Sequence, residues 1–294
     1  MGRVLVCALL MLALGPGRSA TAQDPPPRAV LTGGEFEHVI QRGDTFGLLS
    51  ARFGAGIAAI VERNGLRRDD KLVPGQLLSI GNRHIALIEG PGQLAINLAQ
   101  RMLFLVEGGN VSGYPIAVGL RSWPTPVGRF TVIDKEENPT WDVPLSIQAE
   151  MRAQGKPVIT AMPPSPENPL GKHWIRLSLA SIGIHGTIAP SSVYRYASHG
   201  CMRMHPDDVA ALFGRVSVGT AGIVVYRPVT MARIEGRVFL EVHADVYRRA
   251  PVRLASVEET ARREGYDAQV DWAAVRRVLD EQRGLAVDVT RDDR

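Results

Sequence analysis

Two short segments near the start of the chain carry apolar residues at helical spacing. Within residues 46–53 the apolar positions recur at i, i+3 and i+7, which places them on one face of a helix. The pattern repeats over residues 57–64, and a glycine follows each segment, where a helix can end. Apolar runs at 38–40 and 77–80 lie on either side and predict strands. The sequence therefore predicts a small α+β unit of order βααβ over residues 37–82.

From residue 93 onward the apolar residues come in short runs separated by Gly, Pro and Asn, which is typical of β-strands. The runs that we interpret as strands cover residues 94–98, 101–106, 111–118, 128–134 and 223–226. Pro206 favours the start of a short helix, with Asp207 and Asp208 near its positive end. We expect a mainly β domain over residues 93–227, an antiparallel sandwich or barrel with this short helix.

Two long stretches lack a clear pattern. Residues 135–172 are rich in Pro and Asn and carry few strand signals. A stretch of this length without regular structure is more often a functional lid than disorder. The C-terminal extension covers residues 228–294. Its tail, about 251–294, contains charged amphipathic stretches but no motif, and the simplest expectation is that the tail covers the β domain.

The first residues of the chain predict export. Arg3 precedes an apolar run at 4–14, and Ala20-Thr21-Ala22 is a small-x-small cleavage site. Because the run is too short for a stable membrane-spanning helix, we expect a cleaved signal peptide over residues 1–22 and a periplasmic protein. An uncut N-terminal anchor is the alternative. Residues 23–36 include three consecutive prolines and predict a stiff linker.

Cysteine usage draws attention to one residue. The chain has two cysteines, and Cys7 would leave with the signal peptide, so no disulfide can form within the mature chain. A lone thiol in an oxidising compartment is a liability unless it is buried or has a task. That thiol is Cys201. The formal charge of +4 falls to +2 when Arg3 and Arg18 are removed, which is too weakly positive to indicate nucleic-acid binding.

Residues that can activate a thiol lie close to Cys201 in the sequence. A free thiol has a pKa of about 8.5, so it needs a base to form a thiolate at neutral pH. His199 lies two residues before Cys201, and His185 lies sixteen residues before it, a distance that suits adjacent strands joined by a loop. Gly186 and Gly200 leave room for a substrate or an oxyanion to approach the backbone.

Each of these residues also has a simpler interpretation. A single cysteine is more often a small buried apolar residue than a nucleophile, and a single histidine is more often a hydrogen-bonded core or surface group. A zinc site is a third interpretation, because Cys201 is accompanied by His173, His185, His199 and His205. Structural zinc sites favour several cysteines at short spacing, so we expect no metal.

Taken together, the motifs resemble those of the L,D-transpeptidases, in particular the ErfK-like, LysM-bearing periplasmic type of Gram-negative bacteria. The family signature is His-Gly, a loop, then Ser-His-Gly-Cys, a hydrophobic residue and Arg or Asn. This chain has His185-Gly186-Thr187 and Ser198-His199-Gly200-Cys201-Met202-Arg203. Further features of the subfamily are Thr125-Pro126-Val127-Gly128, Asn138-Pro139-Thr140-Trp141, Asn168-Pro169-Leu170-Gly171 and Leu240-Glu241-Val242-His243.

The resemblance implies a role for each motif residue. Cys201 is expected to be the nucleophile and His185 the general acid and base. The backbone carbonyl of Gly186 is expected to orient the imidazole, and His199 to shape the pocket. The residues expected around the substrate and the oxyanion are Ser198, Gly200, Arg203, Tyr194 and Thr187.

Two of these residues carry open alternatives. Arg203 is expected to support the site or to meet a substrate carboxylate, and the alternative is a structural salt bridge. Tyr194 stands where glycine is common in close relatives, so we expect its ring to narrow the substrate groove.

The unit at residues 37–82 resembles a LysM domain. The pattern of that family is Gly-Asp-Thr after the first strand, Asn at the end of the second helix and Pro-Gly-Gln before the last strand. The matching residues here are Gly43, Asp44 and Thr45, then Asn64, then Pro74-Gly75-Gln76. The resemblance implies binding to N-acetylglucosamine-containing glycans of peptidoglycan, with Gly43, Asp44, Thr45 and Asn64 as the glycan-binding residues. The alternative is a module that packs on its neighbour and binds nothing.

The resemblance as a whole implies an enzyme that needs no cofactor. Cys201 would attack a tetrapeptide stem of peptidoglycan and form a thioester. An amine of a neighbouring stem would then give a crosslink, and a lysine of an outer-membrane lipoprotein would give an anchor. Two alternatives stay open: an L,D-carboxypeptidase that uses water, and a wall-binding scaffold without catalysis, for which Cys201→Ala would leave function intact and thiol alkylation would be slow.

Overall fold

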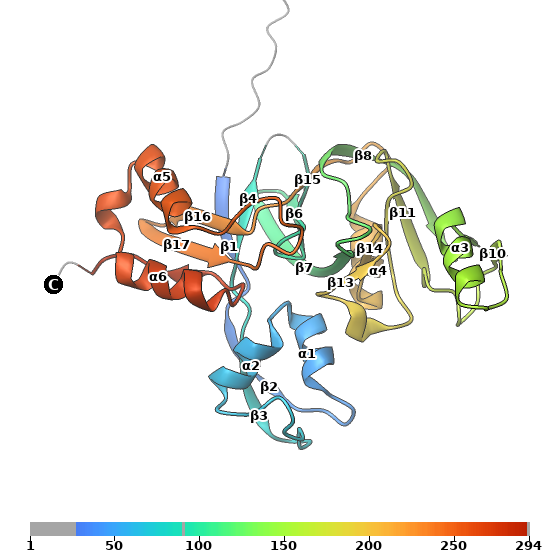
Figure 1. Ribbon diagram of the computed structural model, residues 1–294, viewed down its shortest axis with the longest axis horizontal. Coiled ribbons are helices and arrows are strands. Elements are labelled where there is room, and N and C mark those ends of the chain that lie inside the picture. The colour runs from blue at the N-terminus through green and yellow to red at the C-terminus, as the bar shows by residue number, and fades with distance from the viewer. Residues whose placement is uncertain (1–27, 90–91, 293–294) are drawn as a thin grey trace, which may run out of the picture.

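The computed structural model describes residues 28–89 and 92–292, which form three units with separate hydrophobic cores (Figure 1). The predicted signal peptide lies outside the described residues. Within the described ranges, no helix combines the length and the apolar character that crossing a membrane requires.

The N-terminal unit, residues 33–83, has the predicted βααβ order. Its strands β2 (Glu35–Val39) and β3 (Leu77–Gly81) pair in antiparallel register, and α1 (Phe46–Phe53) and α2 (Ile57–Arg63) pack over them. Helix α1 begins where the Thr45 hydroxyl accepts from the Leu48 amide, and it ends at Gly54, whose φ of 69° is left-handed.

A two-stranded ribbon carries the N-terminal unit. Strands β1 (Arg28–Thr32) and β4 (His84–Ile88) pair in antiparallel register on either side of that unit. The prediction of a linker over residues 23–36 is therefore wrong for residues 28–36. The three prolines at 25–27, which lie outside the described residues, dominated the composition there, whereas the apolar residues of β1 pair with β4 and are partly buried.

The central unit, residues 92–227, is a sheet of nine strands that closes into a barrel. The strand order is β13-β7-β14-β12-β11-β8-β15-β5-β6, and β6 also pairs with β7. The strands are β5 (Leu94–Asn97), β6 (Met102–Glu107), β7 (Asn110–Gly119), β8 (Gly128–Glu137), β11 (His173–Leu177), β12 (Gly183–His185), β13 (Tyr196–Ser198), β14 (Met202–Met204) and β15 (Ala221–Val225). Most pairs are antiparallel, and the core includes Leu103, Val118 and Ile175, each fully buried. The predicted mainly β fold is confirmed, in its barrel form.

Two helices flank the barrel. Helix α4 (Pro206–Arg215) begins at Pro206 as predicted, with Val209 and Leu212 buried against the barrel core. The segment predicted to be irregular contains α3 (Leu145–Ala153) and the short strands β9 (Trp141–Asp142) and β10 (Ala161–Met162), which pair with each other. A 3-10 turn, η1 (Pro190–Ser192), lies between β12 and β13.

The C-terminal unit, residues 228–292, has its own core. Strands β16 (Val229–Ile234), β17 (Arg237–Val242) and β18 (Val287–Asp288) form a sheet, on which α5 (Leu254–Glu264) and α6 (Trp272–Glu281) pack, with the short turn η2 (Asp267–Gln269) between them. The expectation that the tail simply covers the β domain is wrong, because the apolar faces of α5 and α6 are buried against this separate sheet.

Gly222 on β15 tests the packing of the barrel. A Cβ atom there would lie 2.4 Å from Phe130 Cζ and 2.8 Å from Leu94 Cβ. We expect Gly222→Ala to lower the free energy of unfolding by about 1–3 kcal/mol through overpacking, measured by urea denaturation. Gly214→Ala in α4 is the matched control: its Cβ would meet nothing within 4 Å, so we expect no loss of stability. Equal stability of the two variants would contradict this packing.

Candidate active site

Two adjacent strands bring His185 and Cys201 together. Strands β12 and β14 pair in parallel register, with Ile184 opposite Met202 and His185 opposite Arg203. Cys201 directly precedes β14. Paired residues of adjacent strands lie on the same face of a sheet, so His185 and Arg203 share a face. Alternate residues of one chain also share a face, so Cys201, two residues before Arg203, is on that side as well.

The thiol of Cys201 is held among backbone groups. Its Sγ lies 3.6 Å from the carbonyl oxygen of Ser181. Burial raises the pKa of this thiol, while the backbone of Gly183 and the positive charge of Arg203 act in the opposite direction. At neutral pH the resting group is therefore the thiol rather than the thiolate.

The imidazole of His185 is also buried and is 4% exposed. Burial and the positive charge of Arg203 lower its pKa to about 4, although the backbone groups of Gly186 and Leu170 act against the shift. The ring of Trp174 packs on the imidazole at 5.7 Å between centroids. His185 is thus a neutral base at neutral pH, and its Nδ1 has no hydrogen-bond partner within the described structure.

A short turn fixes the backbone before Cys201. Gly200 has a φ of 114°, which strongly favours glycine. The Ser198 hydroxyl donates to the Cys201 carbonyl at 2.5 Å and accepts from the Gly200 amide at 3.2 Å. Ser198 is 1% exposed, so its hydroxyl shapes the turn from inside the protein.

Two residues outside the signature support this turn. The Thr125 hydroxyl donates to the Gly200 carbonyl at 2.7 Å and accepts from the Gly119 amide at 2.9 Å. The Tyr247 hydroxyl then donates to the Gly119 carbonyl at 2.7 Å. Neither residue was predicted to belong to the site. The only signal for Thr125 was its Thr-Pro-Val-Gly motif, and Tyr247 had none.

His199 has one partner on the segment between β8 and β11 and another in the loop before β8. Its Nε2 lies 3.0 Å from Glu150 Oε2 on α3, and its ring packs on Trp123 at 5.3 Å between centroids. The imidazole is therefore tied to α3, which leaves His185 as the base candidate.

The segment between β8 and β11 is also anchored beside β12, the strand that ends at His185. The buried Asn168 amide donates to the Pro139 carbonyl at 2.9 Å. A Cβ on Gly171, whose φ is 67°, would lie 3.2 Å from the Thr187 amide nitrogen. The chain after Asn168 thus passes against the backbone that carries His185.

Comparison with known proteins places these features in a family. Residues 91–230 match the model of the L,D-transpeptidase catalytic domain, and residues 38–81 match the LysM domain. The chain is 32% identical to YcfS, a probable L,D-transpeptidase of Escherichia coli K12, over 97% of this chain and 92% of that protein. It is 28% identical to ErfK/SrfK, a probable L,D-transpeptidase of Salmonella typhimurium LT2, over 90% of each. Among solved structures, L,D-transpeptidase 3 of Mycobacterium tuberculosis matches with 16% identity and a TM-score of 0.35. The match covers 53% of this chain and 76% of that protein's chain.

This chain belongs to the L,D-transpeptidase family. Its central unit contains the catalytic domain of that family, and its N-terminal unit is a LysM domain.

Two residues predicted to face the substrate of this L,D-transpeptidase are buried. The Tyr194 side chain is 5% exposed and is covered by the Arg101 guanidinium, 4.3 Å above the ring centre. The expectation that Tyr194 narrows the groove is therefore wrong for this structure. Its φ of 59° explains why glycine suits this position. Thr187 is 5% exposed, and its hydroxyl accepts from the Ala189 amide at 3.0 Å, which shapes the loop.

The four LysM motif residues are used in holding the domain together. Gly43 forms a turn with a φ of 95°, and Asp44 accepts from the Gln41 amide at 2.8 Å. Thr45 caps α1, and the Asn64 amide group bonds the backbone of Ser79 in both directions. Their role in glycan binding stays a prediction.

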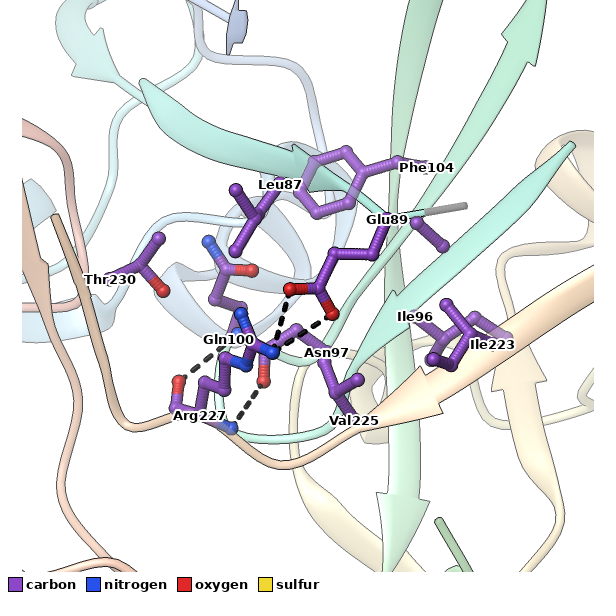
Figure 2. A pocket seen from close by; sticks show the side chains of 11 residues that line it. Leu87, Glu89, Ile96, Asn97, Gln100, Phe104, Ile223, Val225, Arg227 and Thr230 are labelled. Carbon is purple, nitrogen blue, oxygen red and sulfur yellow. Dashed lines mark hydrogen bonds and ion pairs between the residues drawn. The ribbon is translucent and has the colours of Figure 1, made fainter. Parts of the chain in front are cut away.

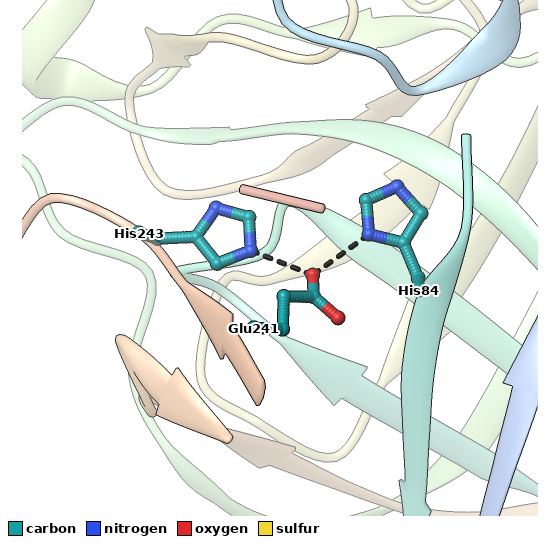
Figure 3. A group of neighbouring side chains, drawn as sticks. All are labelled: His84, Glu241 and His243. Atoms are coloured by element: carbon teal, nitrogen blue, oxygen red, sulfur yellow. Dashed lines mark hydrogen bonds and ion pairs between the residues drawn. The ribbon is translucent and has the colours of Figure 1, made fainter. Parts of the chain in front are cut away.

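The histidines considered for zinc do not gather around Cys201. In the described part of the chain, the group with metal-type ligand atoms close together is instead His84, Glu241 and His243 (Figure 3). Glu241 Oε1 lies 2.7 Å from both His84 Nδ1 and His243 Nε2, and Oε2 accepts from the Ile85 amide at 2.7 Å. Burial alone would raise the pKa of Glu241, but the two histidines lower it to about 2. The three side chains thus form a buried hydrogen-bonded network.

A small cavity lies where the ribbon meets the other units. Its volume is about 10 Å³, room for about one water molecule. It is lined by Glu89, Asn97 and Arg227 among others, and Arg227 pairs with Glu89 at 2.7 Å (Figure 2). The cavity is too small for a peptide substrate, and it is a small void in the packing between the units.

The pH dependence of Cys201 alkylation tests the electrostatics of the site. Because burial raises the pKa of the thiol, we expect labelling by iodoacetamide to reach half its maximal rate above the range of an ordinary thiol, about 8.5. In Arg203→Gln the midpoint should move further up, because a positive charge that stabilises the thiolate is removed. A midpoint below 8 in the wild-type protein would contradict this assignment.

Proposed function

We propose that this protein is an exported L,D-transpeptidase that acts on peptidoglycan tetrapeptide stems through a thioester on Cys201. The observation that supports the proposal is the parallel pairing of β12 with β14, with His185 at the end of one strand and Cys201 directly before the other. The lowered pKa of His185 and the raised pKa of Cys201 make the imidazole and the thiol neutral at neutral pH. The LysM domain supports peptidoglycan as the partner, and the predicted signal peptide supports a periplasmic location.

In the first half-reaction, His185 takes the Cys201 proton as the sulfur attacks the carbonyl of the third stem residue, a diamino acid. The carbonyl oxygen becomes an oxyanion. When the tetrahedral intermediate collapses, the bond to D-alanine breaks, and the imidazolium returns the proton to the departing amine. A thioester and free D-alanine result. Burial of both groups keeps them neutral before the attack, so no ion pair has to be broken first.

The oxyanion requires hydrogen-bond donors near the turn. The Gly200 amide already donates to Ser198 at 3.2 Å, so we propose the Cys201 amide as a donor. Arg203 carries a positive charge on the same face as Cys201 and His185, and in the described part of the chain no carboxylate pairs with it. This favours electrostatic support of the site over the alternative of a structural salt bridge.

In the second half-reaction, His185 accepts a proton from an amine as the amine attacks the thioester carbonyl. The C–S bond breaks, an amide forms, and the sulfur recovers its proton from the imidazolium. A stem diamino acid gives a crosslink, and a lipoprotein lysine would give an anchor. Water in place of the amine would make the protein a carboxypeptidase.

Mass spectrometry tests this function. With a tetrapeptide muropeptide and an amine acceptor, we expect release of D-alanine, an aminolysis product and a transient acyl adduct on Cys201. Cys201→Ala and His185→Gln should each lose about 10³-fold or more of the activity, as removal of a nucleophile or base does elsewhere. Absence of any product from the wild-type protein would support the scaffold, and full activity of Cys201→Ala would exclude Cys201 as the nucleophile. Only hydrolysis products would support the carboxypeptidase. Slow alkylation at neutral pH does not separate enzyme from scaffold, because the raised pKa of the thiol predicts it for both.

The pH profile gives a further prediction. Activity requires neutral His185, and its pKa is lowered to about 4, so kcat/KM should fall on acidification only near that pH. Arg203 lowers this pKa, so in Arg203→Gln the acid limb should shift to higher pH. An acid limb near 6.5, the value of an ordinary histidine, would contradict the buried base.

A further inference from the structure

The loop between His185 and Cys201 packs against the LysM domain. Its 3-10 turn η1 contacts helix α1 of that domain. The next contact is between Arg195 and Gly47: a Cβ atom on Gly47 would lie 3.2 Å from Arg195 Nη2. We call this loop, residues 186–200, the catalytic loop. The absence of a side chain at position 47 lets it approach the first turn of α1.

The buried Tyr194 joins the same loop to the ribbon. Its ring belongs to an apolar cluster with Ala86 and Ile88 of β4 and Phe104 of the catalytic domain. The Tyr194 hydroxyl has no hydrogen-bond partner within the described structure. The ring therefore acts through packing and through the Arg101 guanidinium that covers it.

The LysM domain cannot act as a loose tether, because the ribbon that carries it is held on both faces. Ile85 packs against Ala232 and Phe239 of the C-terminal unit. Its neighbour Ala86 points the opposite way, into the cluster that contains Tyr194.

Polar contacts reinforce this attachment. His84 Nε2 donates to the carbonyl of Gly54 at the end of α1, at 2.8 Å, while its Nδ1 faces Glu241 (Figure 3). Because a carbonyl oxygen can only accept, His84 Nε2 is the donor in the bond to Gly54. Arg283 of the C-terminal unit also pairs with Glu62 of α2.

We propose that the LysM domain is a structural support of the catalytic loop, with Tyr194 as a positioning residue, in addition to any role in binding peptidoglycan. The support reaches the nucleophile through β13. The Arg195 carbonyl accepts from the Val118 amide at 3.0 Å, and the Ser198 carbonyl accepts from the Leu120 amide at 2.8 Å. A shift at residues 194–195 would therefore move Ser198, which holds the turn before Cys201.

The first test uses a tetrapeptide that carries no sugar, with an amine acceptor, so that glycan binding cannot contribute. Because it measures transpeptidation, this test rests on the proposed function. We expect Gly47→Arg, which would push its side chain against Arg195, to lower kcat by about tenfold or more, since small displacements of catalytic groups cost rates of this order. KM should change little. Val73→Arg is the matched control, because it adds the same side chain at an exposed LysM position. Wild-type kcat in Gly47→Arg would overturn the proposal.

The second test compares two changes of Tyr194. Tyr194→Phe keeps the ring and loses only the unpartnered hydroxyl, so we expect most of the kcat to remain. Tyr194→Gly suits the positive φ but removes the ring, so kcat should fall as in Gly47→Arg. Wild-type kcat in Tyr194→Gly would overturn the positioning role.

Hydrogen exchange of residues 186–200 judges the proposal independently of activity. We expect faster exchange there in Gly47→Arg and Tyr194→Gly than in Val73→Arg and Tyr194→Phe. Because loss of the buried ring also lowers overall stability, exchange of the barrel strands in the same samples reports the global effect, and the increase in the loop should exceed it. Unchanged exchange in the first two variants would overturn the proposal. If the wild-type protein formed no product but the exchange followed this pattern, the proposed function alone would fail.

Discussion

The parallel pairing of β12 with β14 is the constraint on which the site depends. A parallel pair needs a crossover connection between its strands, and the chain supplies one as the loop of residues 186–200. Two residues sixteen positions apart are thereby brought to one face of the sheet. The loop is long enough to form contacts of its own, and the turn at Ser198 and Gly200 then sets where the sulfur lies.

Burial determines the electrostatic state of the pair. It lowers the pKa of His185 and raises that of Cys201, and each shift favours the neutral form. Arg203 lowers both pKa values, so it stabilises the thiolate and disfavours the imidazolium. A site of this kind keeps the thiol protonated at neutral pH, and a thiol is less reactive than a thiolate.

Much of the fold and the centre of the site follow from local sequence. The spacing of apolar residues predicts the βααβ unit, Pro206 predicts the start of α4, and the motif predicts that residues 185 and 201 lie on adjacent strands. The supports of the turn could not be predicted, because Thr125 and Tyr247 reach Gly200 and Gly119 across 75 and 128 residues of sequence.

Other errors have local physical causes. Tyr194 was assigned to the groove from its size, whereas its positive φ and the ribbon turn the ring inward. Strand β1 was hidden by the prolines before it, and its pairing with β4 depends on contacts with both neighbouring units. The side chains of Asp44, Thr45 and Asn64 bond their own domain, and glycan binding by these residues stays a prediction.

The protonation state of His185 tests the account most directly, and nitrogen NMR of the imidazole can follow it through a pH titration. The account predicts a neutral ring at pH 6, with a midpoint near 4. A protonated ring at neutral pH, paired with a Cys201 thiolate, would contradict it, because the resting site would then be an ion pair.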